Sequence, residues 1–140
     1  MKELELIKEA FQAQNFSYAP YSKFHVGAAL LGKNGKIYQG CNIENAALTP
    51  TNCAERTAFF KAISEGVTEF EAIVVVGSPE GTKQEDADYC APCGVCRQVM
   101  AEFCDPNRFR VILARTQEDY QEYLLKDILP LGFTGKDINK

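Results

Sequence analysis

The chain has 140 residues, a net charge of −4, and apolar and charged fractions of 46% and 24%, which are typical of one globular domain. No apolar run approaches the roughly 20 residues of a membrane span, and the charged stretch Met1 to Glu5 is unlike a secretory signal. We therefore expect a cytoplasmic protein with no membrane partner. The sequence has no cluster of Lys or Arg of the kind that binds phosphates, which argues against a nucleic-acid partner and for a small, uncharged substrate.

The predicted elements alternate between helix and strand. Apolar residues spaced for one helical face predict a helix at 3–15, and Asn34-Gly35 predicts a hairpin between strands at 24–31 and 37–42. The later elements are a helix at 52–65, a buried strand at 70–77, a polar loop at 78–91, a helix at 94–104, strands at 110–114 and 120–124, and a short helical turn. This order predicts an α/β fold with a mixed sheet, in a single domain spanning residues 1–140.

Three cysteines have the spacing of a zinc site. Cys53 stands two residues before Glu55, and Pro92 precedes a C-x-x-C formed by Cys93 and Cys96. Three thiolates can hold zinc and leave one tetrahedral position open for water. Zinc makes such a water nucleophilic near neutral pH, and a neighbouring carboxylate can move its protons. This spacing is also the Cys₃ form of the signature of zinc nucleobase deaminases.

The expected helices place both ligand groups at helix N-termini. Three thiolates and one zinc ion carry a net negative charge, which would make bound water less acidic. The positive ends of two helix dipoles offset part of this charge. Arg56 could hydrogen-bond the thiolates and offset more.

Other interpretations of the same residues remain open. Cys90 precedes Cys93 by three residues and could close a structural Cys₄ zinc site, which would hold no water. Cys93 and Cys96 could instead form a redox pair. Asn52 and Glu55 could form a capping box at the start of a helix. The single histidine, His25, lies in a predicted strand far from the cysteines and is not expected to bind metal.

Four stretches resemble the small homotetrameric cytidine deaminases. They are Tyr18-Ala19-Pro20-Tyr21-Ser22, Gly40-Cys41-Asn42-Ile43-Glu44-Asn45-Ala46, Cys53-Ala54-Glu55-Arg56-Thr57-Ala58 and Pro92-Cys93-Gly94-Val95-Cys96-Arg97-Gln98-Val99. The resemblance extends from about residue 5 to Phe133. It implies a three-layer α/β/α fold with a five-stranded mixed sheet, and zinc-dependent hydrolysis of cytidine and 2′-deoxycytidine to uridine and 2′-deoxyuridine. It also implies one zinc ion per chain and a homotetramer whose sites are shared between subunits.

The same resemblance assigns roles to individual residues. Zinc is expected on Cys53, Cys93 and Cys96, with Glu55 transferring protons and Arg56 balancing charge. Asn42 and Glu44 match residues that hold the sugar, Phe24 matches an aromatic on the base, and the backbones of Ala54 and Cys93 are expected at the base edge. The residues implied around the substrate are Phe24, Asn42, Ile43, Glu44, Asn45, Ala46, Ala47, Leu48, Ala54 and, from a neighbouring subunit, Phe133.

The sequence departs from the family at two places, and the first puts fine substrate preference in doubt. Leu48 stands where many members carry Tyr, and the 78–91 loop is longer than in the shortest members. The nearest rival enzymes are a blasticidin-type deaminase and an editing deaminase that acts on RNA or DNA. Asn42 and Glu44 favour a ribose-containing substrate over the first, and the missing basic groove disfavours the second.

Overall fold

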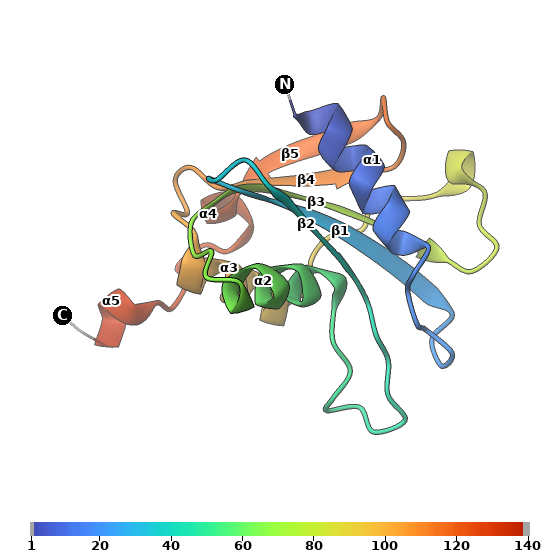
Figure 1. Cartoon of the computed structure of the whole chain (residues 1–140), viewed down its shortest axis with the longest axis horizontal. Helices are drawn as coiled ribbons and strands as arrows, with labels where there is room; N and C mark the ends of the chain where they lie inside the picture. Colours follow the sequence, from blue (N-terminus) through green and yellow to red (C-terminus); the bar gives the residue numbers. More distant parts are fainter. Residues whose placement is uncertain (1, 139–140) are drawn as a thin grey trace.

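The computed structural model describes residues 2–138, which form a five-stranded sheet with helices on both faces (Figure 1). Helix α1 (Glu3–Gln14) covers one face, and α2 (Ala54–Ser64) and α3 (Gly94–Phe103) cover the other. The expected three-layer α/β/α fold is confirmed. The three main helices begin and end within two residues of their predicted limits.

The sheet has the strand order β2-β1-β3-β4-β5. The hairpin predicted at Asn34-Gly35 joins β1 (Phe24–Gly32) to β2 (Ile37–Cys41), and β1 also pairs antiparallel with β3 (Phe70–Pro79). Strand β4 (Arg110–Ala114) runs parallel to β3, and β5 (Tyr120–Leu124) pairs antiparallel with β4 at the edge. The sheet is therefore mixed, as the hairpin predicted.

Strand β3 is buried on both faces, which explains its unbroken apolar sequence. Ile73 and Val75 pack in the cluster beneath α2 and α3, whereas Val74 and Val76 pack in the cluster beneath α1. Alternate residues of a strand point to opposite faces, so each side of the sheet has its own core. Phe59 is fully buried in the first cluster, with its ring 5.0 Å from that of Phe70.

Two glycines let the helices approach the sheet closely. A Cβ on Gly27 would lie 2.1 Å from the carbonyl oxygen of Ala10 in α1, and one on Gly40 would lie 2.3 Å from that of Ala54 in α2. No real Cβ tolerates such contacts, so both positions require glycine. The contact at Gly40 seats the first turn of α2, which contains Glu55, directly on the sheet.

The remaining elements are short. A 3₁₀ turn, η1 (Gln84–Asp86), interrupts the polar loop predicted at 78–91, whose first two residues belong to β3. The turns α4 (Leu125–Ile128) and α5 (Gly135–Ile138) follow β5, and the segment ending in α5 projects from the rest of the molecule (Figure 1). None of the helices within residues 2–138 has both the length and the apolar character needed to cross a bilayer.

The capping box, which was an open alternative for Asn52 and Glu55, does not form. The N-cap of α2 is Cys53, which has an extended backbone (φ −77°, ψ 157°). Asn52 is held one residue earlier in a two-way backbone pairing with Ile43, and its side-chain amide donates to Thr57 Oγ1 at 3.1 Å. Because this pairing keeps residue 52 extended, the helix cannot start there.

Candidate metal centre

The three cysteines singled out from the sequence meet at the N-termini of α2 and α3. The Sγ atoms of Cys53 and Cys93 are 3.7 Å apart, those of Cys93 and Cys96 are 3.4 Å apart, and all three lie within 4.8 Å of one another. Tetrahedral zinc with Zn–S bonds of about 2.3 Å separates its sulfur ligands by about 3.8 Å. The described thiols therefore fit zinc with little adjustment.

Local geometry brings these sulfur atoms together. Cys53 and Cys93 are both N-cap residues with extended backbones, so their side chains turn across the helix ends. Cys96 lies one turn into α3 and is buried, and its backbone N–H donates to Cys93 Sγ at 3.4 Å. The N-cap position also explains how Cys53 and Glu55, only two residues apart, can serve one site.

Electrostatics distinguish Cys53 from Cys96. Hydrogen bonds from Cys96 and from the Arg56 guanidinium lower the pKa of Cys53 to about 5, while the same interaction with Cys53 and burial raise the pKa of Cys96. One thiolate therefore hinders ionisation of its neighbour. A divalent cation removes this conflict, so the donor set suits a metal that binds deprotonated sulfur.

Glu55 and Arg56 complete the centre. The Glu55 side chain is 4% exposed, and burial raises its pKa to about 7. Arg56 Nη2 donates to Cys53 Sγ at 3.3 Å, and its buried Nε has no hydrogen-bond partner among the described residues. A proton-exchanging carboxyl group and a fixed cation thus adjoin the sulfur cluster.

Cys90 is outside the group of sulfur atoms that could share one ion. Its Sγ would lie 2.7 Å from a Cβ on Gly77, so it packs on the β3 backbone, and burial raises its pKa to about 11. The geometry therefore gives no support to a closed Cys₄ site.

The residues expected at a sugar lie beside the start of α2. Ile43 pairs with Tyr18 on one side and with Asn52 on the other, which sets Asn42 and Glu44 next to the metal ligands. Glu44 accepts from the backbone N–H groups of Tyr21 and Ser22 at 2.9 and 3.1 Å and from the Ser22 hydroxyl. Hydrogen bonds from Ser22 lower the pKa of Glu44, so it is a carboxylate near neutral pH.

The other residues expected around the substrate are less enclosed. Phe24 begins β1, and its ring would touch a Cβ on Gly77 at 3.1 Å. The tip of the 42–52 loop, with Asn45, Ala46, Ala47 and Leu48, is exposed, and Leu48 is 86% exposed. Phe133 is 59% exposed in the projecting C-terminal segment. In a single chain, the loop tip and Phe133 are therefore both exposed to solvent.

Several contacts at the site were not expected from the sequence. The Ser17 hydroxyl bonds to the side chain of Asn42, and His25 bonds to Ser17 and to Glu80. Arg97 Nε donates to Pro92 O, and Arg97 Nη1 donates to Ile128 O, both at 2.9 Å. No sequence pattern predicts these contacts, because the two residues of each pair lie in different elements or in loops.

A sulfur cluster at two helix starts with a buried carboxyl group beside it defines a class of protein, the hydrolytic zinc enzymes. Residues 1–112 match the family model described as the cytidine and deoxycytidylate deaminase zinc-binding region. The chain belongs to this family, and zinc is its cofactor.

Curated relatives and solved structures agree with this assignment. The chain is 52% identical over 134 residues to a cytidine deaminase of Halalkalibacterium halodurans, covering 96% of both chains. It is 49% identical over 135 residues to one of Sporosarcina psychrophila, covering 96% of this chain and 93% of the relative. A crystal structure of cytidine deaminase from Burkholderia pseudomallei superimposes with a TM-score of 0.83 at 45% identity, covering 95% of this chain and all of that one.

Proposed function

We propose that this chain catalyses the zinc-dependent hydrolysis of cytidine and 2′-deoxycytidine to uridine and 2′-deoxyuridine, with release of ammonia. The observation that carries the proposal is the meeting of Cys53, Cys93 and Cys96 beside buried Glu55. Relatives of about 50% identity that carry the name cytidine deaminase support the same reaction. When bound by the three thiolates, zinc supplies the positive charge that makes water nucleophilic near neutral pH.

Glu55 is the proposed proton carrier. It accepts a proton from the attacking water and delivers it to N3 of the cytosine ring while oxygen bonds to C4. It then passes the second water proton to the amino group, which leaves as ammonia when the C4–N4 bond breaks. A pKa of about 7 suits this work, because a group that both takes and gives a proton is most effective near the working pH.

The neighbouring residues bind and orient the nucleoside in this proposal. Asn42 and Glu44 hold the sugar, Phe24 packs on the base, and the backbones of Ala54 and Cys93 meet the base edge. Ile43 and the loop residues Asn45, Ala46, Ala47 and Leu48 line the substrate. Arg56 donates to Cys53 Sγ and balances the charge of the sulfur cluster.

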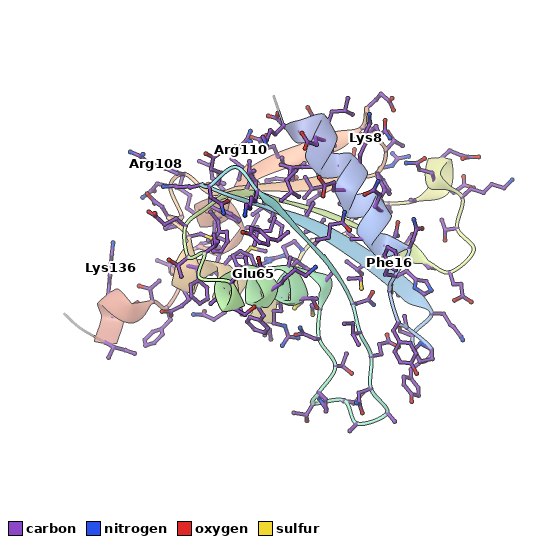
Figure 2. All side chains as sticks on the ribbon, in the orientation of Figure 1. Lys8, Phe16, Glu65, Arg108, Arg110 and Lys136 are labelled. Atoms are coloured by element: carbon purple, nitrogen blue, oxygen red, sulfur yellow. The ribbon has the colours of Figure 1, made fainter. Side chains whose placement is uncertain are left out.

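Ultraviolet absorbance of the purified protein mixed with cytidine, together with zinc content, tests the reaction. We expect loss of the cytidine band and about one zinc per chain. Glu55→Gln should keep zinc and lower the turnover rate by about 10²- to 10⁴-fold. Glu65→Gln, at the exposed far end of the same helix (Figure 2), is the matched control and should keep the wild-type rate. A Glu55→Gln variant with the wild-type rate would exclude the mechanism.

We further propose a homotetramer in the cytoplasm, with Phe133 entering the site of a neighbouring subunit. Free thiols at all six cysteines are compatible with a reducing compartment. Leu131 and Phe133 are exposed on the projecting segment near Lys136 (Figure 2), where they could contact a neighbouring subunit. Light scattering should give four chains per particle. Mixing Glu55→Gln with Phe133→Ala subunits should restore activity if sites are shared.

A further inference from the structure

A chain of side-chain hydrogen bonds leads from the surface to Asn42. His25 Nε2 lies 2.9 Å from Glu80 Oε1, and His25 Nδ1 lies 2.9 Å from Ser17 Oγ. The Ser17 hydroxyl in turn bonds to Asn42 Oδ1. Ser17 directly follows the turn at residues 15–16 that ends α1, where Phe16 is labelled in Figure 2, so residues from four separate segments meet here.

The backbone fixes the orientation of the Asn42 amide. Its Oδ1 accepts from the N–H of Val26 at 2.9 Å, and its Nδ2 donates to the carbonyl oxygen of Phe24 at 2.8 Å. A backbone N–H can only donate and a carbonyl oxygen can only accept, so the amide cannot be reversed.

The same logic gives the direction of the other bonds. Asn42 Oδ1 has no hydrogen, so the Ser17 hydroxyl must donate its single proton to it. Ser17 Oγ is then free to accept, and His25 Nδ1 must donate to it. On the far side, the 2.9 Å contact between Nε2 and Glu80 Oε1 holds the imidazole in place.

These bonds decide what Asn42 can offer a ligand. The amide oxygen already accepts two hydrogen bonds, from Val26 and Ser17, and has no further lone pair to share. One of the two Nδ2 hydrogens is used by Phe24 O, which leaves one hydrogen for a ligand. Without Ser17, the amide would present both an acceptor and a donor.

We propose that Ser17, held by His25, is a positioning residue that makes Asn42 act toward the sugar as a hydrogen-bond donor only. The proposal rests on the proposed function, in which Asn42 and Glu44 bind the sugar. Glu44 is an acceptor only, because it is a carboxylate that already receives three hydrogen bonds. The pair then recognises a hydroxyl group that accepts from Asn42 and donates to Glu44.

The test compares nucleosides with and without sugar hydroxyls. For Ser17→Ala we expect KM for cytidine to rise about 3- to 10-fold while kcat changes less than about twofold, since one hydrogen bond to a binding group is lost. The preference for cytidine over 2′,3′-dideoxycytidine should narrow by the same factor. Ser17→Thr keeps the hydroxyl and should restore both values.

Two further variants sharpen the comparison. His25→Phe leaves the Ser17 hydroxyl without its donor and should raise KM by a smaller factor, about twofold. Ser64→Ala is the matched control, because it removes a serine hydroxyl that donates to Lys61 O at 2.7 Å near the exposed end of α2, far from Asn42 in the sequence. Zinc content should be unchanged in every variant.

Binding separates failure of this proposal from failure of the proposed function. Uridine and 2′,3′-dideoxyuridine are titrated into the same zinc-loaded proteins by calorimetry. If the wild type does not deaminate cytidine yet binds uridine more tightly than the dideoxy form, and Ser17→Ala weakens that preference, only the reaction is wrong. Three outcomes would each overturn the role of Ser17. The wild type could show no preference for uridine over the dideoxy form, or Ser17→Ala could keep the wild-type preference. Ser17→Ala could also lose zinc and kcat together.

Discussion

Helices α2 and α3 both begin at a cysteine, and each carries an arginine in its first turn or just after it. Arg56 points its guanidinium at Cys53 Sγ, 3.3 Å away. Arg97 instead donates to the carbonyl oxygens of Pro92 and Ile128 and joins the start of α3 to α4. Two similar motifs thus have different physical uses, since one arginine acts on the charge of a ligand and the other holds the backbone beside a ligand.

The segments before the two helices also differ, in how firmly each is held by contacts with the rest of the chain. The 42–52 loop pairs with the 17–22 turn but leaves its tip exposed. The 80–91 loop is tied to the β4–β5 connection, where Arg115 donates to Ala87 O at 2.9 Å and pairs with Asp119 at 3.1 Å. Tyr89 also donates to Asp119. The start of α3 is therefore anchored on both sides, whereas the start of α2 adjoins a loop open to a ligand.

Removing a ligand from either helix start should have the largest effect. Cys53→Ala and Cys93→Ala should each bind much less than one zinc per chain and lose more than about 10³-fold in activity, because the metal provides several kcal/mol of transition-state stabilisation. Zinc analysis after gel filtration and the cytidine assay measure both effects. Cys90→Ala is the control and should keep zinc, and loss of zinc in this variant would revive the closed Cys₄ site.

Arg56→Ala should break the charge balance at the start of α2. We expect a loss of about 10- to 100-fold in zinc affinity or activity, as is usual when a group bonded to a metal ligand is removed. The melting temperature of the zinc-loaded protein should change little. Arg56→Lys keeps the positive charge and should recover part of the loss. Equal defects in the two variants would show that hydrogen-bond geometry, and not charge, is what Arg56 provides.

Arg97→Ala should have the opposite effect to Arg56→Ala, because it should lower stability and leave zinc binding intact. It removes two charge-assisted hydrogen bonds to backbone carbonyls, so we expect a loss of about 2 kcal/mol in the free energy of unfolding. Urea unfolding measures it. Arg108→Ala is the matched control, because the Arg108 side chain is 83% exposed and its ion pair with Asp105 is long, at 3.8 Å (Figure 2). If Arg97→Ala is as stable as the wild type but binds zinc poorly, then Arg97 acts on the metal ligands as Arg56 does, and the proposed difference between them is wrong.

The start of α1 contains none of the proposed site residues, and we expect a change there to have only a small effect on stability. Arg110 Nη1 contacts Glu3 Oε1 at 2.9 Å, and this hydrogen bond lowers the pKa of Glu3 below 4.5. A lowered carboxyl pKa stabilises the fold above pH 4.5, and the contribution is lost as pH falls through the folded-state value. Glu3→Gln should therefore cost about 1 kcal/mol or less at neutral pH.

Thermal unfolding from pH 7 into the acid range checks the sign of this effect. The difference in stability between wild type and Glu3→Gln should shrink below pH 4.5. Glu5→Gln, an exposed residue in the same helical turn, should behave like the wild type throughout. A difference that grows as pH falls would contradict the assignment.

Prediction from sequence was accurate where the signal was local. Asn34-Gly35 marked the β1–β2 hairpin, and the apolar run of β3 marked a strand buried on both faces. The helix predicted from residue 52 begins two residues later, at Ala54, and the capping box considered at Asn52 does not form. The pairing of residue 52 with Ile43 kept the backbone extended, because a long-range backbone contact can outweigh a capping preference of about 1 kcal/mol.

The sequence by itself determined the family, the class of fold and the identity of the zinc-binding cysteines, because these depend on periodicity and on the spacing of residues with distinctive chemistry. Only the tertiary structure decided which partners those residues meet. It directed Arg56 to a sulfur atom and Arg97 to carbonyl oxygens. It also placed Ser17 against Asn42. Hydrogen bonds act over a few ångströms in space, and no sequence pattern specifies which distant loops come that close.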